Sequence, residues 1–207
     1  MKIVCLSDTH GVHTHIQIPT GDLLIHAGDF CRYGRPQEIV DFNEWLGSLP
    51  HPHKVIIAGN HDVLFEHAAD FVRPLINNAH YLEDSEVIIE GLKIWGSPVT
   101  PRFFDWAFNR DRGEDIARHW ALIPPDTDIL ITHGPPWGVL DQNQDGRPCG
   151  CANLREKVEE IRPHLHVFGH IHEAYGEHLA EATHFVNVSI MDAAYQPMHR
   201  VRVVELA

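Results

Sequence analysis

Five short apolar runs constrain the fold of this chain most, because each stops at a glycine or polar residue and continues into aspartate, asparagine or histidine. Apolar runs bounded by turn residues are typical of buried strands in an α/β sheet. Functional groups collect beyond the carboxyl ends of such strands, where loops converge and glycine permits sharp turns. We therefore expect one site assembled from distant segments. The five run ends are Ser7-Asp8-Thr9-His10, Gly28-Asp29, Gly59-Asn60-His61-Asp62, Thr132-His133-Gly134 and Gly169-His170-Ile171-His172.

The last run predicts how two of the histidines are presented. If the strand continues past Gly169, His170 and His172 share one face, because side chains two apart in a strand point the same way. Neutral imidazole is the commonest metal ligand. His166 would lie about 13 Å back along a straight strand. We interpret His166, and His26 likewise, as hydrogen-bonded core or supporting residues and not as ligands.

Taken in order, the polar run ends resemble the motif series of the calcineurin-like metallophosphoesterase superfamily. Gly96-Ser97-Pro98-Val99-Thr100-Pro101 and Thr132-His133-Gly134-Pro135-Pro136 are similar to its metallophosphoesterase-domain-containing (MPPED-like) branch. Asp62 is a departure, because many relatives carry glutamate after the Asn-His pair. The shorter carboxylate bears on the support of His61 and removes no metal ligand. His172, which some relatives lack, is present.

The resemblance implies an α/β fold, a four-layer α/β/β/α sandwich with two facing mixed sheets and a dimetal site at the strand ends. It also implies that Asp29 bridges the two metals and that His61 lies beside the leaving-group oxygen as a proton donor. Carboxylate, imidazole and amide donors suit Mn, Fe, Zn or Ni, and the branch favours manganese. The implied ligands are Asp8, His10, Asp29 and His172 for one metal, and Asp29, Asn60, His133 and His170 for the other.

The implied chemistry is in-line attack of a metal-bridging hydroxide on phosphorus. We expect a metal-dependent phosphodiesterase that hydrolyses small phosphodiesters or cyclic nucleotides, since the close branch is associated with that reaction. A phosphomonoesterase is the enzyme alternative, because the same metal clamp serves both reactions. The alternative outside the enzyme classes is a regulatory module that binds metal or nucleotide with little turnover.

Charge and composition limit the partners. With 29 acidic residues against 16 lysines and arginines, the formal net charge is −13, which disfavours binding to long nucleic acid. No apolar run approaches the length that spans a bilayer, and the first residues indicate a strand, not a signal peptide. The four cysteines lack the spacing of a disulfide scaffold. We expect one domain over residues 1–207, a small phosphorylated substrate, no membrane partner and a cytoplasmic location; the oligomeric state is open.

Hydrophobic spacing predicts the remaining elements. Strands are expected on both sides of Gly91, and His51 and His53 are expected to be solvated at a proline turn. Helices are predicted over residues 36–49, 63–76 with an interruption near Pro74, 114–122 and 152–161, and further strands over 185–189 and 199–204.

Two segments carry open alternatives. Residues 97–112 predict a long ordered loop. Its rings Phe103, Phe104 and Trp106, with Trp137, are expected to form a local core; alternatively they line a leaving-group pocket with Arg110 or Arg112 nearby. Cys149-Gly150-Cys151 is expected to be structural, with metal binding or redox pairing as the alternative. Arg32, Arg35 and Arg147 are not assigned to phosphate, so substrate-binding residues stay unknown.

Overall fold

The computed structural model describes residues 1–206 and contains two facing sheets. The first sheet has the order β13-β1-β2-β3-β4 and the second the order β11-β12-β10-β9-β6-β5. Both are mixed, because β13 runs antiparallel to β1, and β5 and β11 run antiparallel to their neighbours. The strands are β1 (Lys2–Leu6), β2 (Leu23–Ala27), β3 (His53–Ile57), β4 (His80–Tyr81), β5 (Ser85–Ile89), β6 (Leu92–Ser97), β9 (Ile129–Thr132), β10 (Leu165–Phe168), β11 (Gly176–Leu179), β12 (His184–Asn187) and β13 (Arg202–Glu205).

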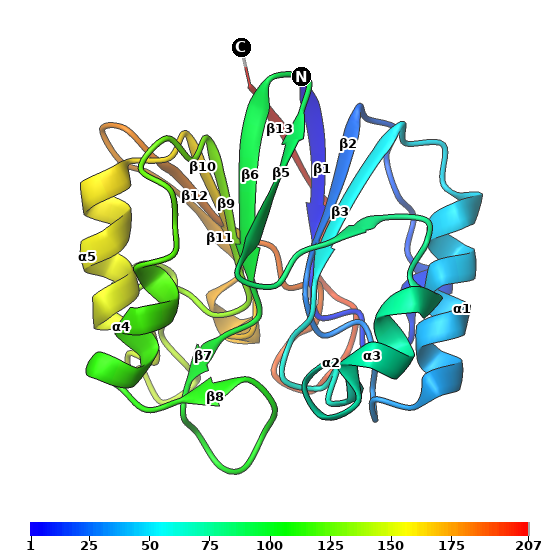
Figure 1. Cartoon of the computed structure of the whole chain (residues 1–207), viewed down its shortest axis with the longest axis horizontal. Helices are drawn as coiled ribbons and strands as arrows, with labels where there is room; N and C mark the ends of the chain where they lie inside the picture. The colour runs from blue at the N-terminus through cyan, green and yellow to red at the C-terminus, as the bar shows by residue number, and fades with distance from the viewer. Residues whose placement is uncertain (207) are drawn as a thin grey trace.

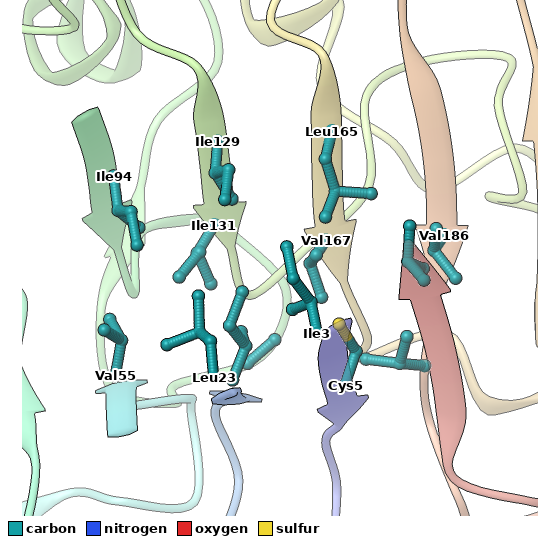
Figure 2. Close-up of a cluster of buried hydrophobic side chains, with 14 of the residues drawn as sticks. Ile3, Cys5, Leu23, Val55, Ile94, Ile129, Ile131, Leu165, Val167 and Val186 are labelled. Carbon is teal, nitrogen blue, oxygen red and sulfur yellow. The ribbon is translucent and has the colours of Figure 1, made fainter. Parts of the chain in front are cut away.

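Alternating side chains of the two sheets form the central core. Ile3 and Cys5 of the first sheet and Ile129 and Val167 of the second belong to one buried cluster between the sheets (Figure 2). The outer faces carry two further clusters, one under each set of helices. Burial on both faces explains why these strands are continuously apolar.

The helices cover the two outer faces, so the predicted four-layer sandwich is confirmed (Figure 1). Helix α1 packs on the first sheet, and α4 and α5 pack on the second. No helix among residues 1–206 is long and apolar enough to cross a membrane. The α-helices are α1 (Pro36–Ser48), α2 (Leu64–His67), α3 (Ala69–Val72), α4 (Glu114–Trp120) and α5 (Ala152–Ile161), with 3-10 turns at η1 (His13–His15), η2 (Arg73–Leu75) and η3 (His172–Ala174).

Several local predictions need correction. The segment predicted as one helix over 63–76 breaks into α2, α3 and η2, because Ala68 leaves helical backbone geometry at φ −144° and ψ 42°. The last strand begins at Arg202, later than predicted. His51 is buried against the carbonyl oxygen of Pro19, 2.9 Å from its Nε2, and is not solvated.

The segment after β12 joins the two sheets at their carboxyl ends. The Val188 N–H donates to Phe168 O at 2.8 Å, and the Ser7 N–H donates to Val188 O at 3.1 Å. Ile190 N–H in turn donates to Ser7 O at 3.2 Å. The ends of β1 and β10 are thereby held side by side.

Candidate metal centre

Seven ligand-type side chains and His61 meet where the strands of both sheets end. Seven of these eight side chains fall into three overlapping groups, and within each group the potential ligand atoms lie within 4.8 Å of one another. The groups are Asp8, His10 and His172; His10, Asp29 and His61; and Asp29, His133 and His170. The Asn60 Oδ1 atom lies 3.0 Å from His133 Nε2. Residues predicted from five separate run ends therefore occupy one place.

Asp29 lies at the centre of the cluster. Its Oδ2 atom is 3.4 Å from His133 Nε2 and 3.9 Å from His10 Nε2. Its Oδ1 atom accepts a hydrogen bond of 2.8 Å from the backbone N–H of His61. On the far side, His172 Nε2 lies 3.5 Å from Asp8 Oδ1. Asp29 is thus the one side chain that belongs to two of the groups through a carboxylate, which is the position a bridging ligand needs.

Backbone carbonyls fix which ring nitrogen faces the site. A carbonyl oxygen only accepts, so the Nδ1 atom beside it carries the hydrogen, and the neutral ring keeps its lone pair on Nε2. Four imidazoles share this arrangement, and a hydrogen bond of this kind is the usual support of a metal-binding histidine. The Nδ1–carbonyl pairs are His10 with Cys31 at 3.3 Å, His61 with Arg32 at 3.1 Å, His133 with Ala27 at 2.9 Å and His172 with Asp192 at 3.1 Å.

The donor set fits divalent cations. When the His133 ring is neutral and Asp29 is ionised, His133 Nε2, Asn60 Oδ1 and Asp29 Oδ2 are all acceptors, and no hydrogen lies between them. The buried Nε2 atom of His10 has no hydrogen-bond partner among the described residues. Converging acceptors and an unpartnered buried nitrogen are costly unless a cation lies between them.

Strained backbone turns present several of the candidate ligands. Four of them have positive φ, with Asp8 at 55°, His10 at 40°, Asp29 at 57° and His170 at 69°. Non-glycine residues rarely adopt this region, and such strain concentrates at functional sites. The prediction that β10 continues through His172 is wrong: the strand ends at Phe168, and His172 begins η3. The two histidines consequently face different groups of the cluster instead of sharing one strand face.

Burial and ion pairing set the charge of the site. Burial lowers the pKa of His10 to about 4 and that of His170 to about 3, so both rings are neutral at pH 7. Burial also disfavours charge on His133, but attraction to Asp29 outweighs it and raises the pKa of His133 to about 9. The pKa of Asp29 is correspondingly held well below its usual range. Buried opposite charges replace part of the neutralisation that a cation provides.

Asp62 supports the loops that carry the site. Its Oδ2 atom accepts hydrogen bonds from the N–H groups of Asp29, at 2.9 Å, and Gly59, at 2.8 Å, while Oδ1 accepts one from Cys31 at 2.8 Å. These bonds hold the turns after β2 and β3 together. The shorter carboxylate therefore acts on the backbone of Asp29, whereas the sequence suggested an effect on His61.

A cavity of about 610 Å³ opens beside Asp29, Asn60 and His61. The expectation that Phe103, Phe104 and Trp106 form a local core is wrong, since all three line this cavity and Phe104 is 86% exposed. Trp106 stacks on His61 with ring centroids 4.4 Å apart, and Phe103 meets His170 edge to face at 4.8 Å. The alternative, a ring-lined pocket, is the one that the structure favours. Trp137 is not among the lining residues.

Contacts with residues outside the loop hold loop residues 97–112 in place. Loop residues 97–112 contain one short parallel pair, β7 (Thr100–Pro101) with β8 (Asn109–Arg110). Glu66 of α2 accepts from the Phe108 N–H at 2.7 Å and from the Arg110 guanidinium at 2.9 Å. Arg110 is therefore engaged with Glu66, whereas Arg112 and Arg147 line the cavity. Arg112 donates to the carbonyl oxygens of Cys149 and Gly150.

The supporting histidines lie where the sequence indicated. His26 Nε2 is 3.0 Å from Thr9 Oγ1, and His166 Nε2 is 2.8 Å from Thr132 Oγ1. Both rings are buried and neither belongs to a ligand group. Sequence reasoning missed Tyr195, which lines the cavity and packs against His10 and His172 at centroid distances of 5.0 and 4.9 Å. No apolar run or motif precedes it to mark it.

Comparison with known proteins identifies the family of this chain. Residues 1–174 match the calcineurin-like phosphoesterase family. The chain is 44% identical to human metallophosphoesterase domain-containing protein 1 over 99% of this chain and 71% of that protein. One crystal structure matches with a TM-score of 0.68 at 15% identity, covering 100% of this chain and 99% of the other. TT1561 of Thermus thermophilus matches with a TM-score of 0.58 at 13% identity, covering 90% and 88%. The structural matches bear on the fold alone.

Proposed function

This chain belongs to the calcineurin-like phosphoesterase family, whose members bind divalent metals in a dinuclear site, and on that premise we propose that it is a phosphodiesterase acting on small phosphodiesters, cyclic nucleotides among them. The observation that carries the proposal is the pair of acceptor clusters sharing Asp29 at the base of an open cavity. A cavity of about 610 Å³ has room for both ester arms of a diester, not only for a phosphate group.

The proposed ligands are those that the resemblance implies. Manganese is the proposed metal, with iron, zinc or nickel as alternatives. When bound, the cations supply Lewis acidity that activates a water and neutralises charge on the phosphoryl oxygens. One ion takes Asp8, His10, Asp29 and His172, and the other takes Asp29, Asn60, His133 and His170.

His61 is the proposed proton donor to the leaving group. Its Nδ1–H is committed to the carbonyl oxygen of Arg32, so Nε2 is the atom available to the substrate. Stacking on Trp106 holds the plane of the ring. As an imidazolium, His61 donates the Nε2 proton to the departing oxygen, and acid catalysis of this kind contributes roughly 10²- to 10⁴-fold.

The test compares matched aryl phosphate diester and monoester substrates. The protein is stripped of metal and reconstituted with manganese, and kcat/KM is measured for both substrates beside an unreconstituted control. Metal-dependent turnover that favours the diester supports the proposal. Preference for the monoester makes the protein a phosphomonoesterase, and no turnover with two ions bound favours a binding role.

A further inference from the structure

Tyr195 lies in the cavity in a backbone conformation that its side chain disfavours. Its φ is 57°, in the left-handed region that L residues with a Cβ rarely adopt. Glycine would take this conformation without a steric cost. Residues held in this way by their surroundings cluster at functional sites. Tyr195 also lies beyond residues 1–174, over which the calcineurin-like phosphoesterase match extends.

Asp192 fixes the turn that presents Tyr195. Its Oδ1 atom accepts hydrogen bonds from the N–H groups of Ala194, at 2.8 Å, and Gln196, at 2.9 Å. Its carbonyl oxygen accepts from the Tyr195 N–H at 3.0 Å and lies 3.1 Å from Nδ1 of His172. One carbonyl therefore sets both the ring orientation of His172 and the backbone of Tyr195. The position of the tyrosine is tied to the metal centre.

The Tyr195 ring lies beside the residues that would handle the substrate. Its centroid is 6.3 Å from that of His61 and tilted by 59°, while Trp106 stacks on His61 at 4.4 Å. Tyr195 and Trp106 come from distant loops, yet both adjoin the proposed proton donor. The tyrosine is 53% exposed.

We propose that Tyr195 is a substrate-positioning residue. Its ring forms the side of the cavity beside His61, where the leaving group would lie, and its hydroxyl donates a hydrogen bond to a phosphoryl oxygen of the bound ester. The inference rests on the proposed phosphoesterase function of the same site. A phenolic O–H suits an anionic oxygen, because hydrogen bonds to a charged acceptor are shorter and stronger than neutral ones. It orients the ester without adding a charge to the metal ligands.

The test removes the hydroxyl and keeps the ring. Tyr195→Phe is compared with wild type and with Tyr33→Phe, a control at an exposed tyrosine outside the cavity. All three are reconstituted with manganese and assayed for kcat/KM on an aryl diester and, by calorimetry, for the Kd of inorganic phosphate. Tyr195→Phe should lose roughly tenfold or more in both quantities, the scale of one hydrogen bond to a charged group. Its metal content should match wild type, and Tyr33→Phe should match wild type throughout.

A second variant separates substrate contact from backbone strain. Tyr195→Gly relieves the positive φ and removes the ring, so the relief of strain should offset the lost ring packing and leave the Tm near that of wild type while phosphate binding weakens. Values for Tyr195→Phe within twofold of wild type in both kcat/KM and phosphate Kd overturn the inference. If wild type binds phosphate without hydrolysing the ester, the proposed function falls, and the ratio of phosphate Kd values still decides the role of Tyr195. If wild type does neither, both proposals fall.

Discussion

His61 differs from the other imidazoles of the site in its surroundings. It is only partly buried, and it has Trp106 on one ring face and His10 edge-on at 4.6 Å. We expect His61→Ala to lower kcat by roughly 10²- to 10⁴-fold, because the proton donor is lost. Two metal ions per chain should remain, as measured by metal analysis of the reconstituted variant. Loss of one ion would instead identify His61 as a ligand, an assignment that its grouping with His10 and Asp29 permits.

Gly59 has no room for a side chain. A Cβ atom there would lie 2.6 Å from the Cε1 atom of His133 and would also strike the Asp29 carboxylate. Gly59→Ala should therefore weaken manganese binding and lower the Tm. Gly134→Ala is the matched control, since its Cβ would make an ordinary contact of 3.4 Å with Thr100. Equal metal affinities and Tm values for the two variants would contradict the steric argument.

The sequence reveals the ligand-type residues but not what surrounds them. Asp8, Asp29 and His133 each stand one residue beyond an apolar run, so strand ends and ligand-type residues coincide along the chain. The groups that orient the imidazoles are backbone carbonyls, which any residue type supplies and no motif marks. Trp106 and Tyr195 reach the site through the paths of two irregular loops, and hydrophobic periodicity carries no information about such paths.

At the scale of elements, strand β10 places the imidazole ring of His166 in the interior of the protein. His166 is fully buried, and burial lowers its pKa to about 3 from an ordinary value of 6.5. The Thr132 hydroxyl donates its hydrogen to the Gly134 carbonyl oxygen. Thr132 Oγ1 therefore accepts a hydrogen bond from the Nε2–H of His166. The ring is therefore neutral in the folded protein, while the unfolded chain takes up a proton below about pH 6.5.

The difference in the pKa of His166 between the folded and the unfolded chain makes the free energy of unfolding depend on pH. The unfolded state binds the extra proton, so the stability contributed by neutral His166 is present above pH 6.5 and is lost as pH falls toward 3. When the pH is lowered from 7 to 5, the free energy of unfolding of wild type should fall by about 2 kcal/mol more than that of His166→Phe. Urea titrations at the two pH values measure this, with His67→Gln as an exposed control. Parallel profiles for wild type and His166→Phe would refute a neutral buried ring.

Regular elements were predictable where one physical signal dominates. Helix α1 follows from apolar spacing, from Pro36 at its first turn and from Glu38, whose carboxylate accepts the Arg35 N–H at 2.8 Å. The same spacing suggested one helix over 63–76, but the backbone leaves helical geometry at Ala68. Glu66, inside that broken stretch, instead anchors the loop after β7, a use that local propensity does not encode.

At the scale of the molecule, the proposed metals connect the two sheets. Asp8, Asp29 and Asn60 follow strands of the first sheet, while His133 and His170 follow strands of the second. We expect Asp29→Ala to reduce occupancy of both metal positions, because its carboxylate belongs to a group on each side. Metal analysis of the reconstituted variant checks this. A variant that still holds two ions would refute the bridging role.

The order of segments along the chain sets the order in which the parts of the site are synthesised. The segment that joins the sheets, Val188 to Ile190, and strand β13, which pairs with β1, both come after the last ligand. Every proposed ligand is therefore synthesised before the segment that joins the sheets and before β13. A nascent chain stalled before Val188 would therefore carry all the proposed ligands without the hydrogen bonds that hold the ends of β1 and β10 side by side.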